Sequence, residues 1–236
     1  MKILSKINDF LEKDYKSSVL SGTMIISPYR FVAAGWTFET TFDNITGWTG
    51  VSGAFSHTTD KISFDADTSL SHMYYDLTTV SDTAWVTQFP LLLSTATEGG
   101  QLQQIYWGIK AGTGDLDSSN DNVAFGMRYG EGAGSGYRNA WGNEASVRNN
   151  IDAYTTAIVS GNYGIQLIRT SSTNIEGKLM NSIFSTTTET NNTTIDSTIT
   201  GLRYLWAGTI NEGTGTNLIG SWTSWKFANG VTVPPI

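Results

Sequence analysis

Apolar and polar residues alternate along four runs in the last third of the chain. The runs cover residues 163–169, 175–180, 201–206 and 221–230, and clusters of Gly, Asn, Ser and Thr separate them. Successive side chains of a β-strand point to opposite faces of its sheet, so a period of two is typical of a half-buried antiparallel strand. The last third of the chain therefore predicts a β-sheet.

The same alternation extends back to Trp36, where short β-favouring runs lie between turn-forming clusters such as residues 43–44, 111–114 and 211–213. A dozen strands at this spacing, with no repeat of fixed period, predict an all-β fold of two packed antiparallel sheets. The expected strands cover residues 36–42, 61–65, 72–77, 84–94, 103–110, 122–129, 154–159, 163–170, 174–180, 183–189, 202–210 and 221–228.

Residues 3–16 form the one segment with a helical pattern. Apolar side chains recur there at spacings of three and four residues, which predicts an apolar stripe on a short amphipathic helix. The stripe consists of Ile3, Leu4, Ile7, Phe10, Leu11 and Tyr15. Because a helix of this length is marginal alone in water, we expect the stripe to dock. It would dock either on the β-domain of its own chain or on a partner subunit or larger particle.

Residues 17–35 are interpreted as a connector, because serine and glycine residues end the helical pattern. Residues 24–26, which stand just before Pro28, predict a lone strand. Such a strand could pair with the sheet of its own chain or with that of a neighbour. We therefore divide the chain into an N-terminal segment of residues 1–35, which would assemble or tether, and a β-domain of residues 36–236.

Composition limits the partners of the chain. Charged residues make up only 15% of it, and the formal net charge of −7 is uneven, because residues 1–30 carry +2 and the remainder −9. An acidic body without a basic cluster argues against nucleic acid, whose phosphates require grouped Lys and Arg. The eight Trp, ten Tyr and ten Phe can fill a packed core and argue against disorder.

The sequence also limits how the chain is stabilised and exported. It has no Cys, which excludes disulfides, thiolate-bound zinc and thiol chemistry. No apolar run approaches the roughly 20 residues of a membrane-spanning helix. Residues 1–4 begin like a signal peptide, but polar and charged residues follow at once, so we expect no standard secretory signal peptide. A protein of this kind that works outside a cell would leave by assembly or lysis.

Several motifs resemble those of a known fold. Residues 74–77 (Tyr-Tyr-Asp-Leu) and 81–86 (Ser-Asp-Thr-Ala-Trp-Val) are similar to a pattern in laminin-G-like, concanavalin A-like jelly rolls of microbial and viral proteins. Residues 163–169, 201–205 and 225–230 follow in the same order. The resemblance covers roughly residues 36–231, except for 111–153. It implies two curved antiparallel sheets with a concave face, a fold that serves lectins, glycosidases, adhesion modules and virion parts alike.

Catalytic motifs do not stand out in the sequence. Glycoside hydrolysis needs two carboxylates that flank the scissile bond, and hydrolases resembling this fold carry a Glu-x-Asp-x-Glu strand. The only Glu-x-Asp here is Glu12-Lys13-Asp14, which lacks the third carboxylate. Serine chemistry needs a base, and only His57 and His72 exist, without a Gly-x-Ser-x-Gly motif. We therefore predict that the protein is not an enzyme.

A calcium site is the best candidate for a metal site. Asp115, Asp117, Asn120 and Asp121 gather hard oxygen ligands in one loop, as Ca²⁺ prefers. The resemblance to laminin-G-like domains implies calcium at a loop edge. The alternative is a solvated turn, since Asp and Asn clusters also form turns.

A glycan site is the best candidate for a binding site. Sugar binding commonly uses an aromatic platform with hydrogen-bonding side chains around it, because a pyranose has an apolar face and a polar edge. The glycine-rich stretch 129–143 is expected to be a loop that presents this inventory. Its candidate residues are Tyr137, Arg138, Asn139, Trp141 and Asn143. The alternative is a long hairpin whose Trp141 packs on the sandwich edge or on a neighbouring subunit.

Most other aromatic residues are expected in the core. Trp222 and Trp225 are separated by an odd number of positions, so on one regular strand they would face opposite sides, one in the core and one on the surface. The remaining core prediction consists of Trp36, Phe64, Tyr75, Trp85, Phe125, Leu167 and Phe227.

Two functional hypotheses follow. The first is a non-enzymatic structural or surface-display protein of a virus or phage particle, such as a capsid decoration, spike or tail part, that assembles through its N-terminal segment. Its partners would be copies of itself or other particle subunits. The alternative is a lectin-like carbohydrate-binding attachment module that recognises cell-surface glycans.

Overall fold

A computed structural model describes residues 24–26, 29–31, 35–66, 70–97, 103–115, 120–129, 137–144, 147–153, 159–211 and 217–235. It describes the backbone alone for the strand residues 24–26, 29–31, 97, 128–129, 137–141, 143–144, 147–153, 211 and 217. The expected helix 3–16, with Ile3, Leu4, Ile7, Phe10 and Leu11, lies outside the described residues. The described part of the chain contains no helix long and apolar enough to cross a membrane.

The N-terminal segment contains a short hairpin. Strand β1 (Met24–Ile26) pairs antiparallel with β2 (Tyr29–Phe31), and Ile25 lies opposite Arg30. The prediction of a lone strand at residues 24–26 is therefore wrong, because β2 of the same chain pairs with it. Residues Trp36–Pro234 group separately into one compact unit.

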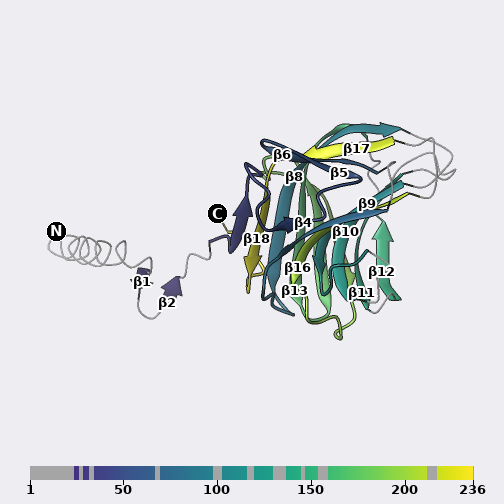
Figure 1. The fold of residues 1–236 in the computed structure, drawn as a ribbon. Coiled ribbons are helices and arrows are strands. Elements are labelled where there is room, and N and C mark those ends of the chain that lie inside the picture. The colour runs from purple at the N-terminus through teal and green to yellow at the C-terminus, as the bar shows by residue number, and fades with distance from the viewer. Residues whose placement is uncertain are drawn as a thin grey trace. The chain divides into compact units, whose positions relative to one another are not determined.

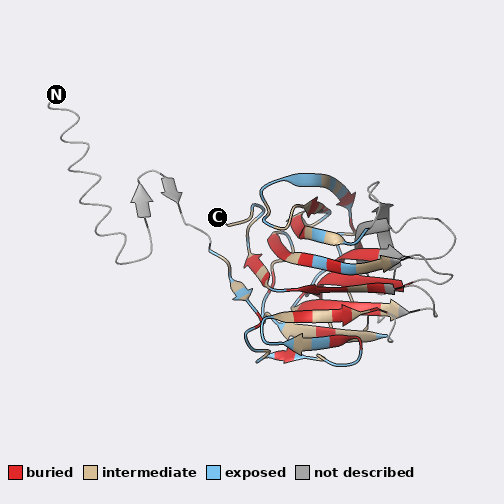
Figure 2. Ribbon diagram, turned by 90° about the horizontal axis from the view of Figure 1, so that it is seen from above, coloured by how far each residue is buried: buried red, intermediate tan, exposed pale blue. Residues whose placement is uncertain are grey.

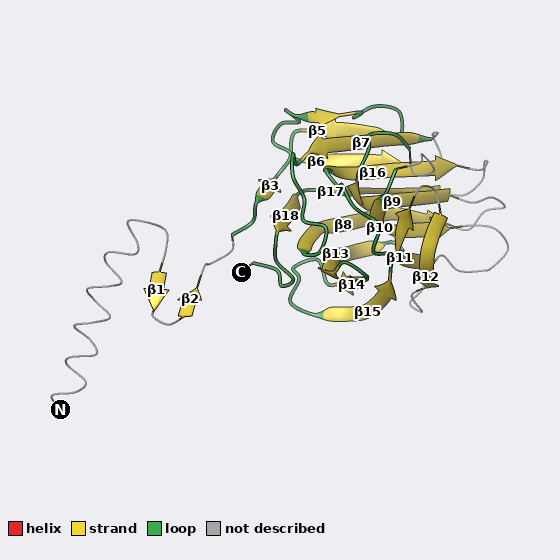
Figure 3. Cartoon of the chain, turned by 90° about the horizontal axis from the view of Figure 1, so that it is seen from below, coloured by secondary structure: helices red, strands yellow, loops and turns green. Residues whose placement is uncertain are grey.

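That unit is an antiparallel sandwich of two sheets, which confirms the predicted all-β class (Figures 1 and 3). The seven-stranded sheet has the order β12 (Val147–Ala153), β11 (Tyr137–Glu144), β10 (Asn122–Tyr129), β9 (Gln103–Lys110), β16 (Tyr204–Asn211), β7 (Ser71–Asp76) and β4 (Trp48–Thr49). The nine-stranded sheet has the order β15 (Thr187–Thr194), β14 (Asn174–Met180), β13 (Gly161–Ser171), β8 (Trp85–Thr97), β17 (Asn217–Trp222), β6 (Lys61–Asp65) and β5 (Phe55–Thr58). Its last two members are β18 (Trp225–Asn229), which pairs with β8, and β3 (Phe38–Thr40), which pairs with β18.

Strands with a clear alternation match their predicted bounds. Strands β6, β9, β10 and β14 begin and end where the sequence predicts. Strand β15 begins four residues later than predicted, and the sequence did not predict β4, β5, β11 or β12. Most of the expected strand 154–159 lies outside the described residues, and Val159 is not in a strand.

The prediction for Trp222 and Trp225 is wrong, because both side chains are fully buried. The strand is interrupted between them at residues 223–224, so Trp222 is the last residue of β17 and Trp225 the first of β18. A break resets the alternation, since the period of two holds only within one continuous strand. The two indole rings meet edge to face, with centroids 6.0 Å apart.

Aromatic side chains from both sheets fill the space between them, and Figure 2 shows the buried residues along the strands of both layers. Trp107 of β9 reaches across to Phe89, Phe64 and Trp222, with ring centroids 5.1, 5.8 and 6.0 Å away. Such pairs contribute roughly 0.5–1.5 kcal/mol each beyond the burial of their surface. Trp36, expected in the core, is instead half-buried, and the ammonium of Lys226 lies 5.7 Å from its ring.

A buried arginine links two connections at one end of the sandwich. Arg169 of β13 is fully buried, and its Nε donates to the carbonyl of Ser171 at 3.2 Å. Its Nη2 donates to the carbonyls of Ser172 and Ile199, both at 2.9 Å. Burial lowers the pKa of Arg169, and the negative charges of Asp82 and Asp121 oppose that shift. The side chain therefore ties the β13–β14 turn to the connection that precedes β16.

We predict that Arg169→Met lowers the free energy of unfolding by about 2–4 kcal/mol, because one buried and two partly buried carbonyl oxygens lose their donor. Urea denaturation measures this. Arg203→Met is the matched control, since it removes an exposed ion pair with Asp76 and is expected to change stability far less. Equal losses in the two variants would contradict the structural role of Arg169.

Candidate functional site

The seven-stranded sheet carries buried apolar side chains on both faces. Its inward residues, such as Trp107 and Val123, belong to the main core. On the opposite face, which we call the front face, Tyr106, Ala124 and Trp206 form a second buried cluster. Tyr74 and Ile210 pack against that cluster. A sheet with one solvated face would alternate apolar with polar residues, so aromatic residues on the outer face need a separate explanation.

The strand register arranges the front face in rows. In one row Tyr74 of β7 lies opposite Trp206 of β16, and Trp206 lies opposite Gly108 of β9. Gly108 in turn lies opposite Ala124 of β10. The row next to it contains Gly208, where a Cβ atom would overlap the indole of Trp206. Glycine at position 208 therefore lets the Trp206 ring lie flat along the front face.

The segment after β9 folds onto this face. The Trp206 Nε1 donates to the carbonyl of Gly114 at 3.1 Å. The fully buried ammonium of Lys110 donates to the carbonyl of Asp115 at 2.7 Å and lies 5.6 Å from the Trp206 ring centroid. Two hydrogen bonds from front-face side chains therefore hold the loop over the tryptophan.

The calcium candidates lie in this same loop. Ala111 donates its N–H to the carbonyl of Asp121, and the Asp121 carboxylate accepts the N–H of Thr200 at 3.0 Å. Asp117 lies outside the described residues, and the ammonium of Lys110 at the Asp115 carbonyl disfavours a second cation nearby. Asn120 lies against Gly112. Among the described residues no group of three or more His, Cys, Asp or Glu could hold a metal ion, and calcium stays a prediction.

The glycan candidates lie on strand β11 and not in a loop, so that part of the prediction is wrong. Trp141 lies opposite Ala124, Asn139 opposite Gly126 and Tyr137 opposite Arg128. Directly opposed positions of an antiparallel ladder share a face, so the register puts positions 137, 139, 141 and 143 on the front face. Position 138 lies opposite Met127, a core residue. The structure therefore brings four of the five candidate positions to one face.

A second group of side chains lies on the front face and was not predicted from the sequence. Unlike those of β11, its side chains are all described. His72 and Tyr74 of β7 are half-buried and lie nearly parallel, with ring centroids 6.4 Å apart. Tyr204 of β16 meets Tyr74 edge to face at 5.5 Å, and the guanidinium of Arg203 lies 5.4 Å from the Tyr204 ring. We call His72, Tyr74, Asp76, Arg203 and Tyr204 the aromatic platform.

The charged members of the aromatic platform form one ion pair. Arg203 donates from Nε to Oδ1 of Asp76 at 2.8 Å and from Nη2 to Oδ2 at 2.6 Å, and both side chains are exposed. The hydrogen bonds from Arg203 lower the pKa of Asp76, which therefore stays ionised at neutral pH. Burial lowers the pKa of His72. The charge of Lys110 adds to this shift and that of Asp115 opposes it, and the imidazole is therefore mainly neutral at pH 7.

The aromatic platform combines exposed ring surface with hydrogen-bonding groups at its edge. Such an arrangement can hold the apolar face of a sugar against tyrosine while charged side chains contact hydroxyl groups. It is poorly suited to glycoside hydrolysis, since a general acid needs a raised pKa and Asp76 has a lowered one. The alternation of His72, Tyr74 and Asp76 was visible in the sequence, but their proximity to Tyr204 depends on the pairing of β7 with β16.

No protein-family model and no curated protein matches the chain. Solved structures do resemble it. The CBM2 module of the evolved Dit of Lactobacillus casei BL23 phage J-1 has a TM-score of 0.56 at 10% identity, covering 84% of this chain and 96% of that one. Lectin II from Ulex europaeus has a TM-score of 0.56 at 9% identity, covering 82% and 99%.

Enzymes share the architecture as well. The Crh5 transglycosylase in complex with NAG has a TM-score of 0.52 at 8% identity, covering 84% of this chain and 86% of that one. Similarity at such identities establishes the fold and leaves the activity open. The sandwich is a concanavalin A-like, lectin-like jelly roll, as the motifs in the sequence predicted.

Proposed function

We propose that this chain is a non-enzymatic carbohydrate-binding attachment module displayed on the surface of a virus or phage particle. The observation that carries the proposal is the aromatic platform, in which half-buried rings of Tyr74 and Tyr204 stand beside the exposed pair Asp76 and Arg203. The resemblance to lectins and to a module of a phage protein supports it. The resemblance to a transglycosylase favours carbohydrate too, and leaves catalysis as the rival function.

The aromatic platform would bind a sugar by two kinds of contact. A pyranose ring would stack on Tyr74 or Tyr204, which hold each other by an edge-to-face contact. Its hydroxyl groups would exchange hydrogen bonds with Asp76 and Arg203, whose bidentate pairing fixes both side chains in advance. Preorganised contacts of this kind lose less side-chain entropy on binding.

Strand β11 would extend the site for a longer glycan. Position 141 stands in the row that begins with Tyr74 and runs through Trp206, Gly108 and Ala124. Position 139 stands in the row beside it, opposite Gly126. The glycan candidates Tyr137, Asn139, Trp141 and Asn143 would therefore form a second part of this face. A longer glycan would reach it by passing over residues 114–115, which cover the buried Trp206 between the two parts.

We expect Tyr74→Ala and Tyr204→Ala each to weaken glycan binding about 5- to 10-fold, the loss of roughly 1–1.5 kcal/mol of ring contact. A glycan array would select the best ligand, and calorimetry would measure its affinity. Trp36→Ala is the control, since it removes a half-buried ring that packs on Lys226 away from the front face. The proposal fails if the wild-type protein binds no glycan, or if the three variants lose affinity equally.

The particle-display part of the proposal rests on the N-terminal segment. Its expected apolar stripe would dock on copies of the same chain or on other particle subunits, leaving the jelly roll free to reach a host glycan. Light scattering of the full-length protein beside a version lacking residues 1–34 tests this. We expect an oligomer for the first and a monomer for the second, and a monomer for the point variant Ile7→Asp/Leu11→Asp. Two monomers of equal stability would rule out self-association through this segment.

A further inference from the structure

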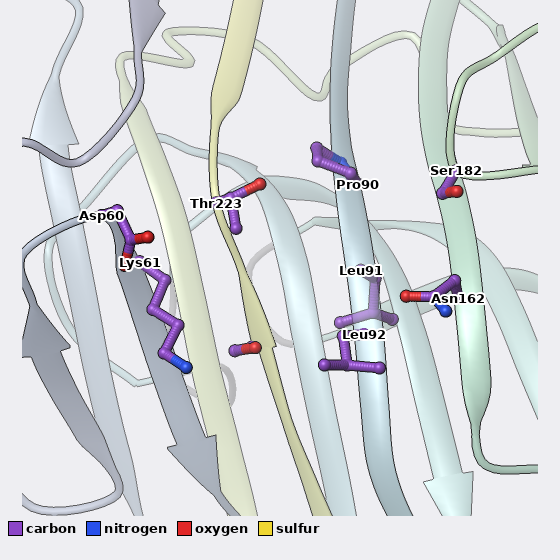
Figure 4. Close-up of a pocket in the computed structure, with 9 residues that line it drawn as sticks. Asp60, Lys61, Pro90, Leu91, Leu92, Asn162, Ser182 and Thr223 are labelled. Carbon is purple, nitrogen blue, oxygen red and sulfur yellow. The ribbon is translucent and has the colours of Figure 1, made fainter.

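A pocket opens on the outer face of the nine-stranded sheet, on the other side of the sandwich from the front face (Figure 4). It has a volume of about 280 Å³ and spans four adjacent strands, β6, β17, β8 and β13. The residues that line it are Asp60, Lys61, Pro90, Leu91, Leu92, Asn162, Ser182, Ser221 and Thr223. The aromatic platform contributes no residue to it.

The centre of the pocket is an apolar side chain between two polar ones. Leu92 of β8 is 42% exposed and supplies apolar surface to the pocket. The register places Ser221 of β17 opposite Leu92 on one side and Asn162 of β13 opposite it on the other. Cβ atoms of such pairs lie about 5 Å apart, so a hydroxyl and an amide flank the apolar surface at close range.

The polar side chains around the pocket are available to a ligand. Within the described part of the chain, no hydrogen bond or ion pair engages the side chains of Lys61, Asn162, Ser182, Ser221 or Thr223. Ser221 is 7% exposed as a whole residue, and it lines the pocket. Like the other polar groups of the lining, its hydroxyl can exchange hydrogen bonds with a ligand in place of water.

One wall of the pocket is closely packed against the sheet. Gly164 of β13 lies opposite Pro90, and a Cβ at position 164 would overlap the carbonyl of Asn181. The turn that contains Ser182 therefore packs directly on the sheet beside the pocket. In Figure 4, Pro90 and Leu92 lie between Ser182 and Asn162 on one side and Thr223, Asp60 and Lys61 on the other.

We infer that this pocket is a second carbohydrate site that takes one neutral hexopyranose unit. Its volume falls just below the roughly 300–1,000 Å³ of sites for drug-sized ligands, which limits it to one ring. The lining supplies one positive and one negative side chain, which favours a neutral ligand, and hydroxyl and amide groups suit vicinal sugar hydroxyls. The apolar surface of Leu92 and Pro90 suits the apolar face of the ring.

The choice of a sugar as ligand rests on the proposed function, whereas the site itself does not. Two sugar sites on opposite faces would let one module contact two glycan chains or two parts of a dense glycan layer. Linked sites raise overall avidity by roughly 10²–10⁴ without any new contact. Weak single-ring binding would therefore be sufficient for attachment by a protein present in many copies on a particle.

The test is a titration of the full-length ¹⁵N-labelled protein with the methyl glycosides of glucose, galactose and mannose and with N-acetylglucosamine. We expect saturable millimolar shifts at the amides of Leu92, Asn162 and Ser221 for at least one of these sugars. Asn162→Ala should weaken that binding about 5- to 10-fold, as the loss of a hydrogen bond implies. Thr223→Trp should abolish it by filling the pocket from an exposed position.

Matched controls separate this site from the front face. Asn174→Ala and Thr188→Trp change exposed residues outside the pocket and should leave the shifts unaltered. Tyr74→Ala should weaken front-face binding about 5- to 10-fold and preserve the pocket shifts. The inference is overturned if no sugar moves the pocket amides, if Thr223→Trp leaves the binding intact, or if Tyr74→Ala removes the same shifts. If Tyr74→Ala leaves both the pocket shifts and the overall glycan affinity unchanged, only the proposal of a glycan site at the aromatic platform fails.

Discussion

The burial of large aromatic rings between two sheets is the constraint on which the rest of this structure depends. Trp107, Trp222 and Trp225 are fully buried and meet Phe89 from both sheets. A strand that slipped by one residue would turn such a ring to the opposite face, so the core fixes the register of the strands that carry it. Register in turn decides which outer residues become neighbours, and both candidate sites consist of such neighbours.

The two outer faces of the sandwich have different chemistry for a physical reason. On the front face, Gly208 leaves room for Trp206 to lie along the sheet, and Lys110 and Trp206 hold residues 114–115 over it. Among the residues whose side chains are described, aromatic surface on this face stays accessible at Tyr74 and Tyr204. The outer face of the nine-stranded sheet has no such cover at Leu92, and hydroxyl and amide groups surround the exposed apolar surface. The first face offers rings for stacking and the second a small polar-rimmed pocket.

The candidate residues of the sequence analysis show why local patterns locate chemistry poorly in this fold. Residues 137–144 include Asn139, Gly142 and Asn143, and both Asn and Gly are depleted in strands. The sequence therefore indicated a loop. They form strand β11 because β10 and β12 hydrogen-bond to both of its edges. Tertiary pairing overrode local propensity, and it moved the candidate site from a loop to a sheet face.

The sequence by itself determined the all-β class, the jelly-roll resemblance and the bounds of strands such as β9 and β14, because alternation is a local property of the chain. It could not determine how Tyr74 meets Tyr204, which lie 130 positions apart, or how Ser221 and Asn162 come to flank Leu92. The sequence also could not show that Trp222 and Trp225 are both buried, because the interruption of the strand at Thr223 ends the alternation. Those outcomes belong to the tertiary structure, because pairing between distant strands is chosen by the packing of the whole core.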